Sequence, residues 1–401
     1  MKIAFFLEAD SKNPGGYNQT LSVANFIYNS FNKNNLIFIV NSHDLSKSLN
    51  KEKIGLINYK KNVIDKFFDF IFEFSFLFRF LIKFNLEHSF TKFLKKNNID
   101  LVIFLSPSEL SLYCGEINFV LNIWDLDHKK DSPFPEHRKN YIFEKRENFL
   151  EIVLFKAFKI IVPHDQNKHD LIKLYNCNKD KIFVQTLIPY LPTILKERII
   201  LSKSEFQSIN NLPLNKKIIL YPSTFWAHKN HKYILDCAAL LKKENINDFH
   251  FLMCGSDRGT FEYIKQSIKE KNLSENITLF SLVSDFLLYK FYEKCYAIIM
   301  PTDAGPTNLP LYEAMFFKKP IFYSQNILKD KEIKKIIIPI DVKDPISFLE
   351  KIKNIENEDI SKKIELGIAH YNKYCNQDTI YHLYNNIIIE FDKVLKQWKN
   401  K

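Results

Sequence analysis

The sequence predicts an α/β protein with two doubly wound parallel-sheet domains, and three observations support this prediction. The chain has 401 residues, which is more than one hydrophobic core usually serves. Hydrophobic residues make up 46% of the chain, enough for two sizeable cores. Short apolar runs alternate with helical patterns along most of its length, and strands that recur with intervening helices are typical of βαβ units.

The predicted strands form two series, separated by a stretch in which the alternation pauses. The first series covers residues 3–7, 36–40, 101–105, 119–124, 159–162 and 182–184, and the second covers 218–221, 249–254, 277–280, 297–300, 320–323 and 336–340. Prolines punctuate residues 189–214 between the two series, which makes this stretch the best linker candidate. We therefore expect one domain at residues 1–192 and another at 193–378.

Two further segments have helical patterns. Apolar residues recur at helical spacing from Ile380 to Trp398, which predicts a long amphipathic helix at the end of the chain. Residues 64–84 are almost entirely aromatic and aliphatic, yet their six charged residues fall on one arc of a helix. So many charges argue strongly against a transmembrane helix. A buried domain helix and an interfacial helix on a membrane both fit the pattern.

The composition narrows the class of partner. The formal net charge of +11 suits an anionic partner such as a nucleotide diphosphate, a lipid phosphate, an acidic membrane or nucleic acid. Nucleic acid is the least favoured of these, because the basic residues are dispersed and no recognised module appears. The six cysteines lie far apart and form no C-x-x-C pair, so we expect reduced thiols in a cytosolic protein. The apolar N-terminal run is too short for a signal peptide.

Two segments of the first half could bind a ligand. Gly15 and Gly16 follow the first strand, where paired glycines let the backbone approach a ligand closely or simply form a turn. They do not make G-x-G-x-x-G, so a dehydrogenase-type dinucleotide site is unsupported. Residues 123–128 close another strand, and there Asp125 and His128 could orient a hydroxyl or assist proton transfer. Asp125 and Asp127 also satisfy the bare D-x-D pattern for a divalent metal, and polar residues that merely close a loop remain the alternative.

Two segments of the second half are more specific. His228, Lys229 and His231 cluster near the N-terminus of a predicted helix at residues 230–243, where cations are electrostatically favourable only if an anion binds. The second segment, residues 303–315, follows a strand and starts a helix, so its N–H groups could point at a diphosphate. Glu313 lies inside that helix, where its carboxylate could accept both hydroxyls of a ribose. A solvent-exposed helical glutamate is the alternative.

Taken together, these segments resemble glycosyltransferase family 4 in both order and content. The stretches "YPSTFWAHKNH", "FLMCGSD" and "GPTNLPLYEAMFFKKPIFYS" resemble its nucleotide-sugar domain, and "GGYNQTLSVA" and "WDLDHKKDSPFPEHR" resemble its acceptor-side loops. The resemblance implies a GT-B fold, in which two Rossmann-like domains face a central cleft. It also implies that residues 379–401 form a helix that crosses back to the N-terminal, acceptor-side domain.

The resemblance assigns roles in the nucleotide-sugar domain. Glu313 matches the second Glu of the family's E-x7-E pattern, which binds the donor ribose, and Lys229 matches the phosphate-binding Lys. The first Glu of that pattern falls at Gly305, so Asp303 or Asn308 would have to supply its contact with the donor sugar. The family's upstream Arg falls at Thr224, with His228 as its replacement. Thr307, Asn308 and Leu309 form the helix start that would hold the diphosphate.

On the acceptor side, the family's sugar-contacting His falls at Trp124, and His128 is the nearest substitute. We therefore expect Lys229, His128 and Glu313 to carry the chemistry. Gly15, Gly16, Asp125, Thr224 and His228 would contact substrates, together with residues 307–309.

The expected protein is a retaining glycosyltransferase that needs no cofactor and no metal. It would move a sugar from a nucleotide-diphosphate sugar to a saccharide, in particular a lipid-linked one, during synthesis of O-antigen, capsule or a related surface polysaccharide. We expect it in the cytoplasm, peripheral on the inner face of the membrane, with residues 64–84 against anionic lipid. A metal-dependent transferase that uses Asp125 and Asp127, a nucleotide-sugar epimerase of GT-B shape and a non-catalytic binding relative are the alternatives.

Overall fold

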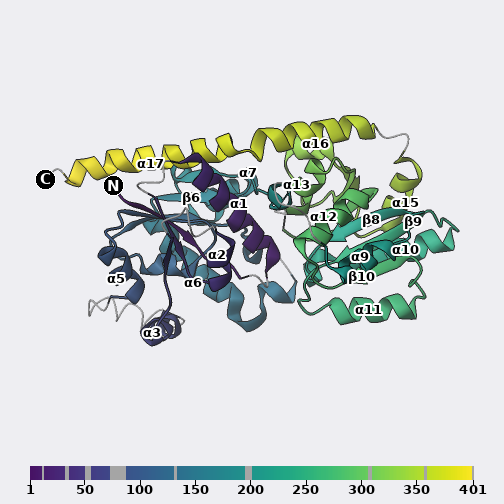
Figure 1. Ribbon diagram of the computed structural model, residues 1–401, viewed down its shortest axis with the longest axis horizontal. Helices are drawn as coiled ribbons and strands as arrows, with labels where there is room; N and C mark the ends of the chain where they lie inside the picture. The colour runs from purple at the N-terminus through teal and green to yellow at the C-terminus, as the bar shows by residue number, and fades with distance from the viewer. Residues whose placement is uncertain are drawn as a thin grey trace. The chain divides into compact units, whose positions relative to one another are not determined.

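The computed structural model describes residues 1–10, 13–31, 36–49, 56–72, 87–130, 133–194, 201–305, 309–355 and 359–399. By their contacts the residues separate into two compact units (Figure 1). The first comprises Met1–Asp131, Arg138–Ile188 and Cys375–Lys401, and the second comprises Ser132–His137 and Pro189–Tyr374. A short piece of the middle of the chain thus belongs with the second unit.

The first unit is built on a seven-stranded parallel sheet with the order β3-β2-β1-β4-β5-β6-β7. Its strands are β1 (Ile3–Leu7), β2 (Leu36–Val40), β3 (Leu56–Asn58), β4 (Leu101–Phe104), β5 (Asn118–Asn122), β6 (Lys159–Val162) and β7 (Ile182–Val184). Every residue of β1 and β4 is buried, as expected for a parallel sheet covered on both faces.

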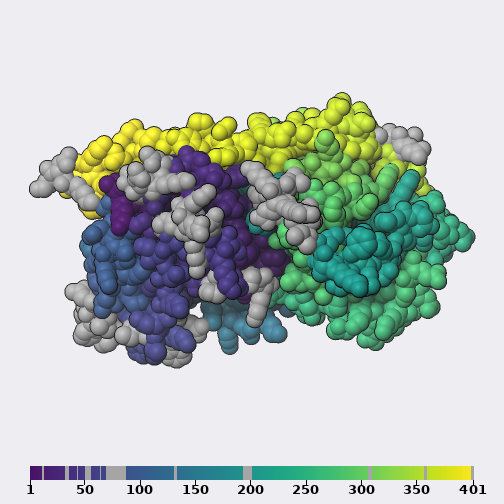
Figure 2. Space-filling model, viewed as in Figure 1, coloured from purple at the N-terminus to yellow at the C-terminus, as the bar shows by residue number. Residues whose placement is uncertain are grey.

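The helices of the first unit include the last one of the chain. They are α1 (Pro14–Ser30), α2 (His43–Ser48), α3 (Val63–Phe72), α5 (Ser89–Lys96), α6 (Ile142–Lys156), α7 (Asp165–Tyr175) and α17 (Gln377–Lys399). The last helix, α17, packs along α1 (Figure 1) and brings the ring of Tyr384 edge-on to Phe5 of β1. On the face shown in Figure 2, its yellow surface borders the purple surface of the N-terminal residues.

The second unit is built on a six-stranded parallel sheet with the order β10-β9-β8-β11-β12-β13. Its strands are β8 (Lys217–Pro222), β9 (Phe249–Cys254), β10 (Ile277–Phe280), β11 (Ala297–Met300), β12 (Ile321–Ser324) and β13 (Ile338–Ile340). Its helices are α8 (Leu191–Ile194), α9 (Lys203–Asn210), α10 (His231–Lys243), α11 (Phe261–Glu270), α12 (Asp285–Lys294), α13 (Leu309–Phe316), α14 (Lys331–Ile336), α15 (Pro345–Lys353) and α16 (Ile360–Tyr374).

All twelve predicted strands are present, with small differences at their ends. The strand predicted at 119–124 ends at Asn122, and the strand predicted at 336–340 begins at Ile338 because α14 extends to Ile336. The short β3 was not predicted. The predicted linker is not irregular, because it contains α8 and α9, and a capping box of Ser202 and Glu205 starts α9.

Of the aromatic segment predicted at 64–84, the structure describes α3 only, and residues 73–86 lie outside the described part. No helix among the described residues is long and apolar enough to cross a bilayer. All six cysteines are free thiols, and burial raises the pKa of Cys254 and Cys295 to about 12.

Candidate functional site

The second sheet reverses its strand order between β8 and β11. From β8 the chain winds outward through β9 to β10, and then returns to the other side of β8 with β11. Ligands of open α/β sheets bind at the carboxyl ends of the strands that flank such a reversal. The backbone carbonyl of His228, in the loop after β8, accepts hydrogen bonds from the N–H of Asp303 at 2.8 Å and from Oγ1 of Thr302 at 3.2 Å. The loops that follow β8 and β11 are therefore joined at this edge.

The first part of the β8 loop is held by the segment that follows β9. A Cβ atom at Gly255 would lie 2.1 Å from the carbonyl oxygen of Ser223, so only glycine permits this approach. The N–H of Phe225 donates to the carbonyl of Ser256 at 2.9 Å, and Oγ of Ser256 lies 3.4 Å from Oγ1 of Thr224. The predicted substrate-binding residue Thr224 is thus half-buried at the edge where the strand order reverses.

Lys229 ends a single turn of 3-10 helix, Ala227–Lys229, in the same loop. Its carbonyl accepts a hydrogen bond from the hydroxyl of Tyr221 at 2.7 Å, and its side chain is half-buried. The next residue, Asn230, adopts φ 52° and caps α10 by accepting a hydrogen bond from the N–H of Tyr233. This left-handed turn places Lys229 directly before the N-terminus of α10, where an anion is electrostatically favoured.

His228 is paired with a residue that is distant in sequence. Oε1 of Glu136 lies 3.0 Å from the backbone N of His228 and 2.5 Å from its Nδ1. The side chain of Glu136 is 6% exposed and that of His228 is 13% exposed. Burial, followed by the charge of Lys229, lowers the pKa of His228 to about 4, although Glu136 acts in the opposite direction. His228 is therefore neutral at pH 7.

The interpretation of three clustered cations is therefore wrong for His228, and it is wrong for His231 as well. The imidazole of His231 is 2% exposed and stacks on Phe225, with ring centroids 4.1 Å apart. Its Nε2 lies 3.3 Å from the carbonyl of Ser223. Burial lowers the pKa of His231 to about 3, so the ring is neutral and belongs to the core under the loop. Its position at the start of α10 could not distinguish a buried ring from an exposed cation.

Glu313 lies in α13 and is only 7% exposed, which excludes the alternative of a solvent-exposed glutamate. The hydroxyl of Tyr292 in α12 donates to its Oε2 at 2.6 Å. Burial raises the pKa of Glu313 to about 7, although this hydrogen bond lowers it. Leu309 is the first described residue of α13 and is half-buried. Thr307 and Asn308 lie outside the described residues.

In the first unit, Gly15 and Gly16 do not form a loop before a helix as predicted. The helix α1 begins at Pro14, so both glycines lie in its first turn, and proline is favoured at that first position. Gly15 is exposed, whereas a Cβ at Gly16 would lie 2.8 Å from Cζ3 of Trp124. Gly16 therefore provides room for Trp124. The backbone of Gly16 was expected to approach a ligand closely, but here it approaches the side chain of Trp124.

Glu8 was not predicted as a site residue. It follows β1, where the first sheet reverses its strand order between β1 and β4. Its carboxylate accepts hydrogen bonds from Nδ2 of Asn41 at 2.7 Å and from Oγ of Ser108, and its carbonyl accepts one from Oγ of Ser106. Burial nevertheless raises its pKa. The sequence did contain a feature that could have singled out Glu8, because it is an acidic residue directly after the first strand.

The segment after β5 carries the remaining predicted residues. Asp125 is half-buried and accepts a hydrogen bond from Nη2 of Arg146 at 2.8 Å. Burial would raise the pKa of Asp125, but the Arg146 guanidinium outweighs it and lowers that pKa. Asp127 pairs with Nζ of Lys130 at 2.7 Å. Because each aspartate already has a cationic partner, the pair does not resemble a vacant divalent-metal site, and the described residues contain no cluster of at least three His, Cys, Asp or Glu that could hold one.

The side chain of His128 is fully buried. Its Nε2 lies 2.8 Å from Oε1 of Glu147, and its Nδ1 has no hydrogen-bond partner in the described part of the chain. Burial, followed by the charge of Arg146, lowers the pKa of His128. Glu147 also accepts hydrogen bonds from Lys129 and Tyr175. The structure thus places His128 in a hydrogen-bonded cluster within the first unit.

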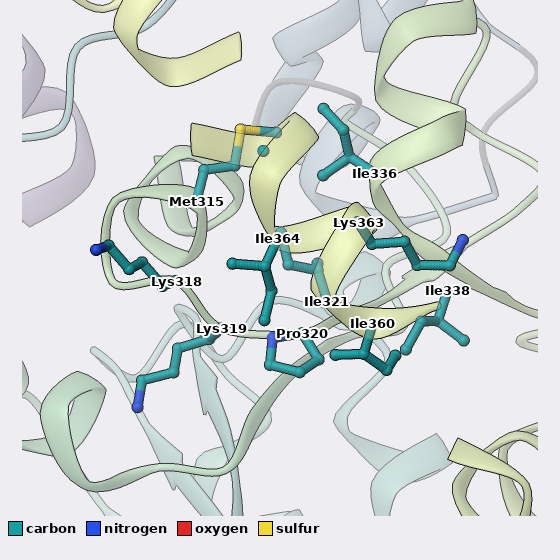
Figure 3. Close-up of a pocket in the computed structure, with 11 residues that line it drawn as sticks. Met315, Lys318, Lys319, Pro320, Ile321, Ile336, Ile338, Ile360, Lys363 and Ile364 are labelled. Carbon is teal, nitrogen blue, oxygen red and sulfur yellow. The ribbon is translucent and has the colours of Figure 1, made fainter. Parts of the chain in front are cut away.

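A pocket elsewhere in the second unit has the wrong chemistry for a polar ligand. Figure 3 shows its lining of aliphatic side chains from α13, β12, β13, α14 and α16, with lysine stems at its margin. Nζ of Lys319 donates to the carbonyl of Cys295, and Nζ of Lys363 donates to that of Ile337. The residues that line it offer no carboxylate and no hydroxyl. The edge between β8 and β11 is the better candidate for binding a nucleotide.

Known proteins resemble the chain in its second half by sequence and along its whole length by fold. Residues 202–367 match the family model of glycosyl transferases group 1, and no curated protein has a significant sequence match. HepE of Anabaena, crystallised with UDP and glucose, has a TM-score of 0.67 at 14% identity over 97% of this chain and 99% of its own. Sucrose-phosphate synthase of Thermosynechococcus elongatus has a TM-score of 0.71 at 15% identity over 98% and 99%. WaaG, a glycosyltransferase involved in lipopolysaccharide biosynthesis, has a TM-score of 0.65 at 12% identity over 96% and 99%.

The two parallel sheets and these neighbours show the GT-B fold, with two Rossmann-like α/β domains, and confirm the predicted fold class. The match of residues 202–367 covers the β8 and β11 loops described above. The protein is therefore a glycosyltransferase of GT-B fold.

Proposed function

We propose that the protein is a family 4 enzyme that transfers a sugar from a nucleotide-diphosphate sugar to a saccharide acceptor with retention of anomeric configuration. The observation that carries the proposal is the 2.8 Å hydrogen bond from the N–H of Asp303 to the carbonyl of His228. It joins the loop that bears Lys229 to the segment that leads to Glu313. A nucleotide diphosphate requires a cation for its phosphates and an acceptor for its ribose hydroxyls, and these two loops supply both.

In this proposal the residues of the second unit bind the donor. Lys229 binds the diphosphate, and the carboxylate of Glu313 accepts the ribose hydroxyls. Thr224 and Leu309 lie on the same two segments and line the donor site, together with Thr307 and Asn308. Negative charge develops on the departing diphosphate, and Lys229 stabilises it without a metal. The departing phosphate oxygen itself helps to deprotonate the acceptor, so no strong protein base is required.

Residues of the first unit bind the acceptor in the same proposal. The half-exposed carboxylate of Asp125 is better placed for a hydroxyl than His128, whose ring is enclosed beside Glu147 and Phe143. We propose that His128 positions the segment that carries Asp125. Gly16 acts through Trp124, which it allows to lie against the first turn of α1, and the exposed Gly15 stays a candidate for direct contact.

The acceptor in this proposal is a lipid-linked saccharide, and the pathway makes a surface polysaccharide in the cytoplasm at the inner face of the membrane. Two observations support membrane contact. The α3 helix exposes 82% of Val63 and 56% of Phe67, and the exposed lysines Lys60 and Lys66 lie nearby in sequence. Apolar side chains flanked by lysines favour an anionic lipid surface.

The experiment is a transfer assay that separates the candidate activities. Structures of similar fold contain UDP, so UDP-sugars are tested first, followed by GDP-sugars and dTDP-sugars. Labelled donor is incubated with the protein, excess EDTA and a bacterial lipid extract. We expect label in the lipid fraction and, by NMR, a product with the anomeric configuration of the donor. Conversion of donor without an acceptor would indicate an epimerase, and binding without turnover would indicate a non-catalytic relative. Either result would contradict the proposal.

A further inference from the structure

A short segment between β5 and α6 packs on the imidazole of His228. Besides the hydrogen bonds that His228 donates to Glu136, the ring of His137 stacks on that of His228 with centroids 5.7 Å apart. The ring of Phe134 meets it edge-on at 6.1 Å. Three of the five described residues in Ser132–His137 thus fix the position of one side chain in the β8 loop. These contacts fix the orientation of the His228 ring.

The contact with Glu136 determines which nitrogen of His228 carries a proton. A carboxylate oxygen only accepts hydrogen bonds, so Nδ1 must be the donor at 2.5 Å. In the neutral ring, Nε2 then presents a lone pair. Nε2 has no hydrogen-bond partner among the described residues. These residues do not bury the atom completely either. Nε2 is therefore available to a ligand.

Charged and titratable groups surround His228, and they lie on all the segments that pack against it. Glu136 and His137 lie on one side, Lys229 is the next residue, and Asp303 lies in the segment after β11. Of these, Glu136 favours an imidazolium, whereas burial and Lys229 oppose it and keep the pKa of His228 low. The pair thus holds a neutral imidazole beside a buried carboxylate.

We propose that His228 binds the diphosphate of the donor as an imidazolium, taking up a proton from solvent as the diphosphate arrives, and that Glu136 is its positioning residue. This inference rests on the proposed function, which places the diphosphate at Lys229. An arriving diphosphate adds negative charge beside Nε2, which favours the protonated ring. The protonated Nε2 then donates a charge-assisted hydrogen bond to a phosphate oxygen, while Nδ1 donates to Glu136.

The test is a count of protons taken up on binding. The probe is UDP, or GDP or dTDP if one of these binds more tightly, and binding is measured by calorimetry at pH 6.5 in EDTA. Repeating the titration in buffers of different ionisation enthalpy gives the number of protons exchanged. Glu313 and the phosphate of the probe also exchange protons, so His228→Gln is measured in parallel to subtract them. We expect wild type to take up about one proton more than His228→Gln.

Glu136→Gln distinguishes a charged positioning role from a structural one. Glutamine keeps an oxygen that accepts from His228 but removes the negative charge, so the uptake should fall towards that of His228→Gln. Glu262→Gln, an exposed carboxylate of α11, is the matched control and should retain full uptake.

Two results would overturn the inference. One is equal proton uptake by wild type and folded His228→Gln. The other is full uptake by Glu136→Gln, which also decides the matter if His228→Gln does not fold. Binding of no diphosphate by wild type is a different outcome, because it contradicts the proposed function itself and this inference with it.

Discussion

The hydroxyl of Tyr292 donates a hydrogen bond of 2.6 Å to Oε2 of Glu313, and both side chains are buried between α12 and α13. Burial raises the pKa of Glu313 to about 7, and the hydrogen bond from Tyr292 keeps it from rising further. The carboxyl group that we propose to bind the ribose is therefore partly protonated at neutral pH before any ligand arrives.

The raised pKa of Glu313 predicts a pH-dependent stability. An ordinary Glu has a pKa of about 4.5, so between pH 4.5 and 7 the folded state binds more protons than the unfolded state. The stabilisation is complete below pH 4.5 and is lost as the pH rises to about 7. Relative to Glu313→Gln, wild type should lose roughly 2–3 kcal/mol of unfolding free energy between pH 5 and pH 8.

Urea unfolding of both proteins across this pH range measures the difference. Glu262→Gln serves as the control and should follow wild type at every pH. Parallel pH profiles for wild type and Glu313→Gln would show that Glu313 titrates normally.

Gly16 should be intolerant of a larger side chain. The Cβ of Gly16→Ala would meet Cζ3 of Trp124 at 2.8 Å, so the indole or the helix must move. Alanine improves helix propensity by about 1 kcal/mol, and the overlap costs about 1–3 kcal/mol. We expect Gly16→Ala to lower the free energy of unfolding measured by chemical denaturation. The same change should have a smaller effect in the Trp124→Phe variant, which lacks the Cζ3 atom of the indole. An equal effect in both backgrounds would contradict this account.

Binding of a nucleoside diphosphate should not need a divalent metal. Asp125 is paired with Arg146 and Asp127 with Lys130, so neither carboxylate is placed to hold one. Excess EDTA should leave the affinity for the best nucleoside diphosphate unchanged within about twofold. Binding that returns only with Mg²⁺ or Mn²⁺ would instead support the metal-dependent alternative.

The exposed apolar side chains of α3 should contribute to membrane contact. Replacing Val63 and Phe67 together with serine should weaken sedimentation with anionic liposomes at low salt roughly tenfold, because a buried Phe contributes about 1.5–3 kcal/mol. Phe155→Ser is the matched control, since Phe155 is 78% exposed on α6. If wild type is not retained by the liposomes, or if the control weakens retention equally, the proposed membrane contact is wrong.

The alternation of apolar runs predicted the fold because parallel strands covered on both faces have few polar residues. Each predicted strand is present, and β3 was missed: none of its three residues is fully buried, and its last residue is the exposed Asn58. The ends of elements were less predictable. Pro14 starts α1 earlier than two glycines suggested, and Asn122 rather than Trp124 ends β5. Such boundaries depend on local capping and contacts that an apolar pattern does not record.

The candidate site was predictable where it depended on position after a strand. Lys229 and Glu313 both follow strands that flank the reversal of strand order, and the sequence placed them there. Burial was not predictable, because the same spacing fits an exposed cation and the buried ring of His231. The pairing of Glu136 with His228 joins residues 92 positions apart, and no local pattern indicates such a contact.

The central claim is that a nucleoside diphosphate binds beside Lys229, and calorimetry on Lys229→Met tests it most directly. A panel of UDP, GDP, ADP and dTDP is titrated into wild type, Lys229→Met and the control Lys232→Met in excess EDTA. Lys232 is exposed on α10 and pairs with Asp236, so it matches the change in charge at a nearby position. We predict that one diphosphate binds wild type and the control with affinities equal within about twofold and binds Lys229→Met roughly 10–100-fold more weakly. Equal binding to wild type and Lys229→Met would contradict the claim and remove the donor site from this loop.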